Sequence, residues 1–185
     1  MIKFSRAALG PALLAAAGVA SAATAAATVS AHDNSLYGPI GNGQVAGLDG
    51  LDTGLSISAG ELLTFSATGS WNNSDPDSSY VSGADGHDGF VGDGHPNFDY
   101  SQFGLNAAYG ALVGKIGNGD YFLIGDSFSG AANATGELQL FYWDSDYGNN
   151  TGSVNVQISA IPEPANIALM GLALGAFALS RRRKA

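Results

Sequence analysis

The chain has 185 residues, 16 of them acidic and 7 basic, with a formal net charge of −9 and no cysteine. The lack of cysteine excludes a disulfide framework, a thiolate metal site and a cysteine nucleophile. Six of the seven basic residues lie near the two ends of the chain, so Lys115 is the only one between Ala23 and Ile161. Fifteen acidic residues leave that segment at about −14, which argues against binding to nucleic acids or anionic membranes and favours cations.

The first 22 residues have the pattern of a secretory signal peptide. Residues 1–6 are a short basic head, residues 7–19 are an apolar run, and Ala20-Ser21-Ala22 is a small-residue cleavage pattern. We therefore expect an exported protein whose mature chain begins near Ala23, with cleavage as late as Ala31 as the alternative.

Residues 23–50 are predicted to be an N-terminal linker followed by a first short strand. Residues 23–31 are rich in Ala, Thr and Ser and are interpreted as signal remnant or linker. Val45 and Leu48 are the apolar side chains that a short strand there would bury.

Two strands are predicted between residues 51 and 71. Apolar and polar residues alternate over Thr53–Ser58 and again over Leu62–Trp71, and Ala59-Gly60-Glu61 between them is a turn sequence. Alternation with period two is typical of half-buried strands. We expect a pair of strands joined by a tight turn, with Trp71 in the core.

The segment 72–106 is long and polar, rich in Gly and Asp, and is interpreted as a soluble insertion or a functional loop. Its aromatic residues indicate that it packs against the rest of the protein. It also holds five side chains whose spacing leaves open a zinc site or a second calcium site: Asp85, His87, Asp88, Asp93 and His95.

The second half of the chain predicts further strands at residues 107–117, 121–125, 138–142 and 154–158, and a connection of small residues at 126–136. No stretch of the core has a convincing helical period. Seven or eight short strands separated by turns indicate an all-β protein, a jelly-roll-like antiparallel β-sandwich over residues 51–160.

The loop after the 138–142 strand is the candidate site. It presents Asp144, Asp146, Asn149 and Asn150 within seven residues, together with two glycines. Ca²⁺ takes six to eight oxygen ligands from carboxylates, amides and carbonyls, so this loop predicts a calcium site. The alternative is an ordinary polar turn. Trp143 is predicted to be a core aromatic, with a sugar-stacking face as the alternative.

Residues 161–185 resemble a PEP-CTERM sorting signal. A Pro-Glu-Pro box at residues 162–164 precedes an apolar run, Ala165 to Leu179, and a basic tail. The run is a marginal transmembrane helix by length, and the basic tail supports a cytoplasmic end. The resemblance implies a Gram-negative bacterium, transient inner-membrane anchoring by one C-terminal apolar helix, removal by an exosortase-type enzyme, and delivery to the cell surface or extracellular matrix.

Several core segments resemble the PA-I galactophilic lectin family of small bacterial β-sandwich lectins. They are DTGLSISAGELLTFSATGSW (52–71), His95-Pro96, GALVGKIGN (110–118) and LQLFYWDSDYGNNTGSVNVQI (138–158). The resemblance implies a sandwich that binds one Ca²⁺, which itself coordinates two sugar hydroxyls.

Carried over to this sequence, the resemblance implies side-chain calcium ligands at Asp144, Asn149 and Asn150. Backbone carbonyls would come from Asp146 and from the turn at 72–74, where we assign Asn73. Asp144, Asn149 and His95 would contact a galactose-like sugar. The loop after Asp144 is shorter than in that family, so Asp146 binding through its carboxylate is the alternative. Phe98 stands where the family has an amide that assists this histidine.

We find no sequence motif for catalysis. Asp75 and Asp77 are paired carboxylates, but nothing places them on opposite sides of a glycosidic bond, and there is neither a nucleophile elbow nor a phosphate loop. The sequence therefore predicts an exported, non-enzymatic, calcium-dependent carbohydrate-binding protein that contacts exopolysaccharide or other glycans. The alternative is a structural matrix or biofilm protein with a calcium-stabilised sandwich and no sugar site.

Overall fold

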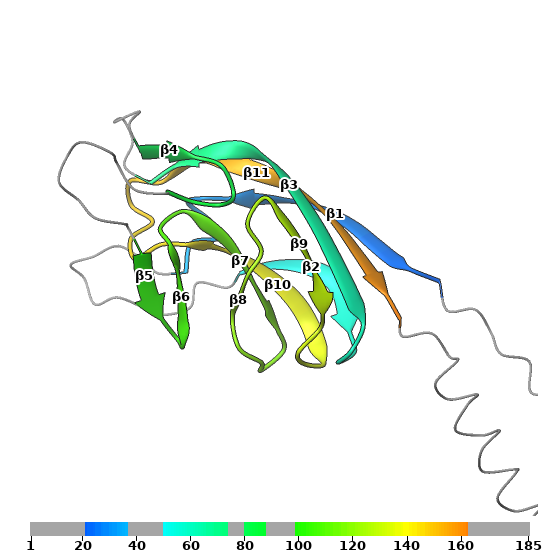
Figure 1. Cartoon of the computed structure of the whole chain (residues 1–185). Coiled ribbons are helices and arrows are strands. Elements are labelled where there is room, and N and C mark those ends of the chain that lie inside the picture. The colour runs from blue at the N-terminus through cyan, green and yellow to red at the C-terminus, as the bar shows by residue number, and fades with distance from the viewer. Residues whose placement is uncertain (1–20, 37–49, 74–79, 88–98, 163–185) are drawn as a thin grey trace, which may run out of the picture. The chain divides into compact units, whose positions relative to one another are not determined.

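The computed structural model describes residues 21–36, 50–73, 80–87 and 99–162, and this part of the chain is built from antiparallel β-strands (Figure 1). The predicted signal peptide up to residue 20, the Val45/Leu48 strand and the C-terminal segment from residue 163 lie outside the described residues. The strands are β1 (Ala23–Ser30), β2 (Leu51–Ile57), β3 (Leu62–Asn72), β4 (Val81–Ser82), β5 (Asp99–Gln102), β6 (Leu105–Ala108), β7 (Ala111–Ile116), β8 (Phe122–Leu123), β9 (Ser127–Ala131), β10 (Gly136–Trp143) and β11 (Thr151–Ile161).

These strands form two main sheets and one hairpin. One sheet has the order β1-β11-β3-β4, with β9 also paired to β3, and the other has the order β2-β10-β7-β8. β5 and β6 pair only with each other. The predicted all-β sandwich of antiparallel strands is confirmed.

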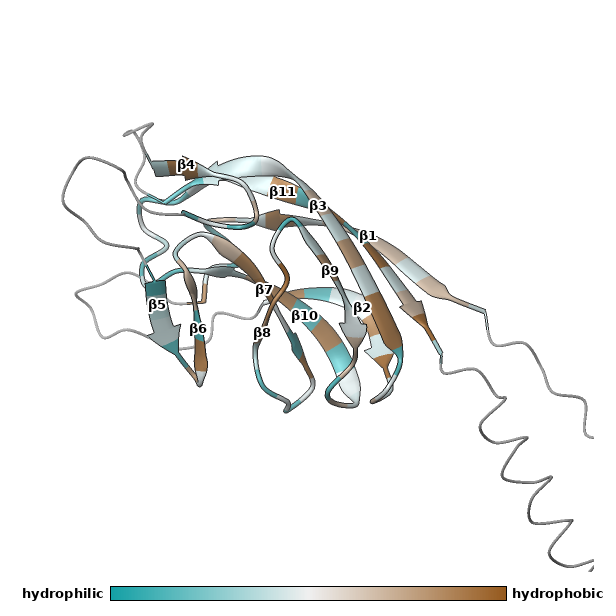
Figure 2. Cartoon of the chain, viewed as in Figure 1, coloured by the Kyte–Doolittle hydropathy of each residue, from teal (hydrophilic) through white to brown (hydrophobic). Residues whose placement is uncertain are grey.

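Alternating side chains of facing strands fill the space between the two sheets. Leu138, Leu140 and Tyr142 of β10 are fully buried there, and Val154 and Val156 of β11 meet them in the same apolar cluster. Figure 2 shows the resulting alternation of apolar and polar bands along the strands. Burying a large aliphatic side chain contributes about 1.5–3 kcal/mol, so this interior supplies most of the folding energy.

A second, smaller core lies on the outer face of β7 and β10, under the β5–β6 hairpin. Phe141 and Trp143 are buried there beside Val113. Trp143 has no exposed surface, and its indole Nε1 donates a hydrogen bond of 2.9 Å to the carbonyl oxygen of Tyr100. Both tryptophans are core residues as predicted, and the alternative of a sugar-stacking face on Trp143 is wrong.

The linker interpretation of residues 23–31 is wrong. This segment forms β1, which pairs with β11 from Ala23↔Ala160 to Ser30↔Ser153. Its small Ala and Thr side chains carry little hydrophobic contrast, so the strand is specified by its partner more than by its own sequence. The small-residue segment 126–136, predicted to be a connection, likewise contains β9, which pairs with β3.

The two strands on either side of the turn predicted at residues 59–61 do not pair with each other, so the predicted strand pair is wrong. β2 belongs to the β10 sheet and β3 to the β11 sheet, so the turn at residues 58–61 carries the chain between sheets. The loop between β10 and β11 makes the same crossing. Alternation identifies a strand and its buried face but not its partner, which depends on contacts distant in sequence.

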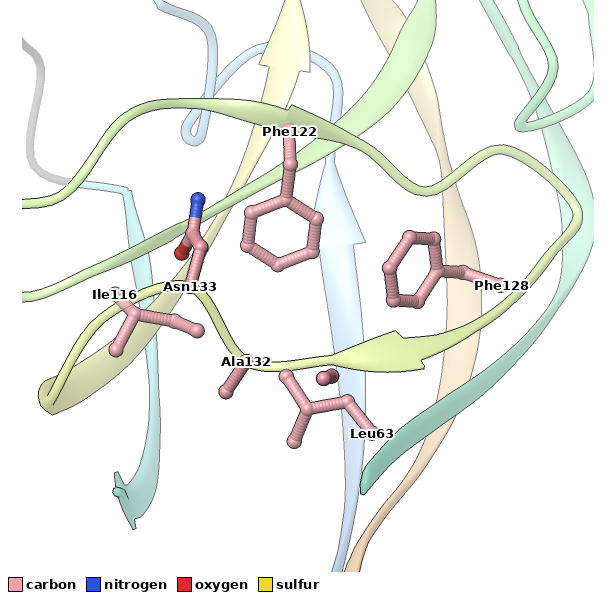
Figure 3. Close-up of a pocket in the computed structure, with 7 residues that line it drawn as sticks. Leu63, Ile116, Phe122, Phe128, Ala132 and Asn133 are labelled. Carbon is pink, nitrogen blue, oxygen red and sulfur yellow. The ribbon is translucent and has the colours of Figure 1, made fainter. Parts of the chain in front are cut away.

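A small apolar cavity of about 60 Å³ lies between Leu63, Ile116, Phe122 and Phe128 (Figure 3). Ile116 ends β7 and Leu63 is the second residue of β3, so this cavity is at the opposite end of the sandwich from Trp143. Within the described ranges, no helix has the length and hydrophobicity needed to cross a membrane.

Candidate functional site

Three strands of the two sheets place the predicted ligand residues at one end of the sandwich. Thr151 of β11 pairs with Asn72 of β3, and Asn150 and Asn73 are the residues next to this last pair. Asp144 directly follows β10. The strand ends therefore bring together residues separated by more than 70 positions in sequence.

Gly152 makes the close approach of β11 to β3 possible. Its φ is +86°, a conformation that other residues rarely adopt, and an added Cβ would lie 2.8 Å from the carbonyl oxygen of Ser70. No side chain fits there without displacing the backbone. A glycine is required at this position for the start of β11 to lie this close to β3.

Asp144 is a buried carboxylate that is only partly satisfied. Its side chain is 5% exposed, and Oδ1 accepts a 2.6 Å hydrogen bond from the backbone N–H of Ser145. Oδ2 is buried and has no hydrogen-bond partner. Burial raises the pKa of Asp144 to about 6, and the nearby Asn150 side chain and the N–H groups of Ser145 and Asp146 offset part of that rise.

Asn150 and Asn73 also have buried oxygen atoms without partners. The Nδ2 of Asn150 donates a 3.2 Å hydrogen bond to the carbonyl oxygen of Ala31, while its Oδ1 makes none. The Oδ1 of Asn73 is likewise buried and unpaired. Each buried acceptor without a partner costs about 1–3 kcal/mol, and a charged one costs more. Three such oxygens at one strand-end junction need a cation or ordered water to satisfy them.

The chemistry of these donors fits calcium. Among the residues that the structure describes, no three His, Cys, Asp or Glu side chains gather into a metal-binding group. One carboxylate, two amide oxygens and the surrounding backbone carbonyls are instead hard oxygen donors, the kind that Ca²⁺ accepts in flexible numbers. Zinc prefers nitrogen and sulfur ligands and fits this set poorly.

The other predicted site residues are placed differently. Asp146 is half-buried, and its Oδ1 accepts a 2.8 Å hydrogen bond from the N–H of Gly148, which closes the loop. Asn149 is exposed to solvent. His95 lies outside the described residues, so its predicted sugar contact stays a prediction.

The alternative zinc or second calcium site also involves residues beyond the described ranges, since Asp88 and Asp93 lie outside them. His87 is described and is 8% exposed. Its Nε2 lies 2.7 Å from the carbonyl oxygen of Tyr80.

The structure adds Ala31 and His32, which follow β1, to the rim of the site. Ala31 N–H donates a 3.1 Å hydrogen bond to Gly152 O. The ring of His32 meets that of Tyr147 edge-on, with centroids 4.7 Å apart. This contribution was not predicted, because residues 23–31 have the composition of a linker and carry only a weak strand signal.

Tyr142 lies directly behind Asp144 in the core. Its hydroxyl is buried without a hydrogen-bond partner, and burial together with the Asp144 charge raises its pKa. Ser82 Oγ is also buried and unpaired, and an added Cβ on Gly110 would lie 3.0 Å from it and 3.3 Å from the Tyr142 hydroxyl. These two hydroxyls form a small polar space suited to an ordered water molecule.

The arrangement as a whole is a β-sandwich with an oxygen-lined site where strands of its two sheets end, and comparison with solved structures finds the fold among lectins. A solved structure described as the EclA N-terminal domain, a PllA-like lectin, matches with a TM-score of 0.53 and 20% identity, over 74% of this chain and 95% of that chain. At this identity the likeness shows the fold alone. No protein-family model and no curated protein matches the chain.

Proposed function

We propose that this chain is an exported, calcium-dependent carbohydrate-binding protein without enzymatic activity. The observation that carries the proposal is that Asp144, Asn150 and Asn73, at the ends of β10, β11 and β3, each have a buried, unpaired side-chain oxygen atom. Sequence resemblance suggested the side chains of Asp144 and Asn150 and a backbone carbonyl near Asn73 as ligands, and the orphaned side-chain oxygens are an independent reason to expect a bound cation. The lectin-type fold of a solved neighbour supports the carbohydrate-binding class.

The buried residues would bind the ion, and the exposed residues would contact the sugar. Asp144 and Asn150 are buried and would hold the ion through their side-chain oxygens, with Asn73 and the Asp146 carbonyl beside them. The exposed Asn149 would face the ligand. When bound, calcium would supply direct coordination of sugar hydroxyls. His95 would contact a galactose-like sugar from the neighbouring loop.

We also propose the route to the cell exterior. Removal of residues 1–22 would leave β1 intact, because that strand starts at Ala23. Cleavage at Ala31 would remove β1, so the earlier cleavage fits the fold better. The C-terminal segment 161–185 would anchor the protein transiently in the inner membrane until an exosortase-type enzyme releases it to the surface or matrix, where exopolysaccharide is available.

A glycan array probed with calcium and again with a chelator tests the proposal. We expect binding that the chelator abolishes, and calorimetric calcium binding that Asp144→Ala removes. Asp120→Ala, an exposed acid in the β7–β8 turn, is the matched control and should change neither. If calcium raises the melting temperature but no glycan binds, the structural matrix function replaces the lectin function. An unchanged calcium titration for Asp144→Ala would refute the site.

A further inference from the structure

The tip of the β5–β6 hairpin has an aromatic residue in a strained position. Phe103 has φ +47° and Gly104 has φ +83°, so both central residues of this two-residue turn have positive φ. Such turns favour Asn-Gly or Asp-Gly, and a bulky residue in the left-handed region costs about 1–2 kcal/mol. The Phe103 side chain is still 46% exposed, so burial offsets only part of this cost. Local strain retained at an exposed position points to a use for the side chain.

Neighbouring aromatic rings hold the Phe103 ring in a fixed orientation. It stacks on Tyr121 with centroids 5.5 Å apart and an interplanar angle of 24°. Tyr121 packs edge-on against the buried Phe141 at 5.3 Å, and the Lys115 ammonium lies 5.0 Å from the centroid of the Tyr121 ring. Phe103 is therefore a rigid flat surface supported from behind, which lowers the entropy lost when a ligand binds.

Polar side chains with fixed orientations lie beside this ring. A shallow hollow of about 370 Å³ is lined by the six hairpin residues 101–106. Ser101 Oγ donates a 2.5 Å hydrogen bond to Asn106 Oδ1, and Asn106 Nδ2 donates a 3.1 Å bond to Asp99. An amide nitrogen has two N–H groups, so Asn106 keeps one for a ligand.

An aromatic face beside hydroxyl and amide groups matches the chemistry of a sugar ring. One face of a pyranose presents C–H bonds that pack on the electron-rich face of an aromatic ring. The ring's hydroxyls then need neutral donors and acceptors at its edge, which Ser101 and Asn106 provide. Because the surrounding core is strongly acidic, a polyanionic sugar chain is disfavoured.

We propose that Phe103 and the outer face of the β5–β6 hairpin form a second carbohydrate-binding site, which takes a neutral pyranose unit and needs no metal ion. This site is distinct from the Asp144 loop and does not depend on it. A protein with both sites would contact one polysaccharide at two points or join two polysaccharide chains. The second contact would raise the avidity for long glycans above the affinity for a single sugar.

The test uses the full chain, isotopically labelled and kept in chelator so that the calcium site cannot contribute. Cellotetraose, β-1,4-galactotetraose and maltotetraose are the neutral probes, and tetragalacturonate is the anionic one. We expect at least one neutral probe to shift the amide resonances of residues 101–106. Phe103→Asn, which tolerates positive φ, should weaken that binding by about fivefold to tenfold without unfolding the protein.

The matched control is Leu62→Ala, which removes a side chain of similar exposure, 43%, from the other sheet. It should leave binding in chelator unchanged, and because the calcium site is empty in chelator, failure of that site is separable from failure of this one. The proposal is overturned if no neutral probe shifts the hairpin, if Phe103→Asn binds as well as the wild type, or if only tetragalacturonate binds. Self-association that Phe103→Asn abolishes, without sugar binding, would assign the hairpin to contact between copies.

Discussion

Replacing Asp144 by Asn should stabilise the metal-free protein while removing its response to calcium. Burial raises the pKa of this carboxyl from 3.8 to about 6. Two units of pKa, at about 1.4 kcal/mol each, make the ionised side chain cost about 3 kcal/mol of folding free energy at pH 7.5. Asn has nearly the same shape and cannot ionise, and its amide nitrogen can donate to the unpaired Oδ1 of Asn150.

The sign of the pH dependence follows from the direction of the shift. A carboxyl whose folded-state pKa is raised holds its proton more tightly in the folded state. Its contribution to stability is therefore present below about pH 4 and is lost as the pH rises through about 6. In chelator, the variant should melt roughly 10 °C above the wild type at pH 7.5, and this gap should nearly vanish at about pH 4.

Calcium should reverse the comparison. A ligand at a thousandfold excess over its Kd stabilises the wild type by about 4.1 kcal/mol, which exceeds the advantage of the variant in chelator, and the variant should gain little. Differential scanning calorimetry with and without calcium measures both effects, with Asp120→Asn as the control for removal of an exposed charge. A variant that melts below the wild type in chelator, or that gains as much from calcium as the wild type does, would refute the reasoning.

Three further predictions concern the framework of the site. Gly152→Ala should lower the unfolding free energy by about 2 kcal/mol or more in urea denaturation, because of its positive φ and the 2.8 Å clash with Ser70 O; no loss would contradict the geometry. Asn150→Ala should cost about 1–2 kcal/mol by freeing Ala31 O and should abolish calcium binding in calorimetry, whereas an unaltered titration would remove this residue from the ligand set. N-terminal sequencing of the exported protein should find a start at or before Ala23, and a mature chain starting at Ala31 would show that β1 is dispensable.

The sequence predicted the strands that carry hydrophobic contrast. β3 and β11 alternate apolar residues with polar ones, and β10 is rich in large apolar residues, so their sequences locate these strands. β1 and β9 consist mostly of Ala, Ser, Thr and Gly, so their sequence differs little from that of a loop. Their conformation depends on hydrogen bonding to β11 and β3, which no local pattern reports.

The same limit applies to the site. The oxygen donors of the 144–150 loop were visible because they are adjacent in sequence. The burial of Asp144, the position of Asn73 beside Asn150 and the hydrogen bond to Ala31 result from pairings between distant strands. The hairpin with Phe103 at its tip was missed because it lies within a segment whose average composition is that of a polar loop.

The strand β11 also determines how this protein would carry a mechanical load. Asn150 directly precedes β11 and Ile161 ends it, so a glycan held at the site and a tether joined beyond Ile161 would pull along the same strand. β11 is hydrogen-bonded to β3 at eleven register positions and to β1 at eight. A force along the axis of β11 would load the hydrogen bonds to β3 and to β1 all at once instead of breaking them one at a time. If β1 is retained on export, the protein would resist detachment under flow by sharing tension across two strand interfaces.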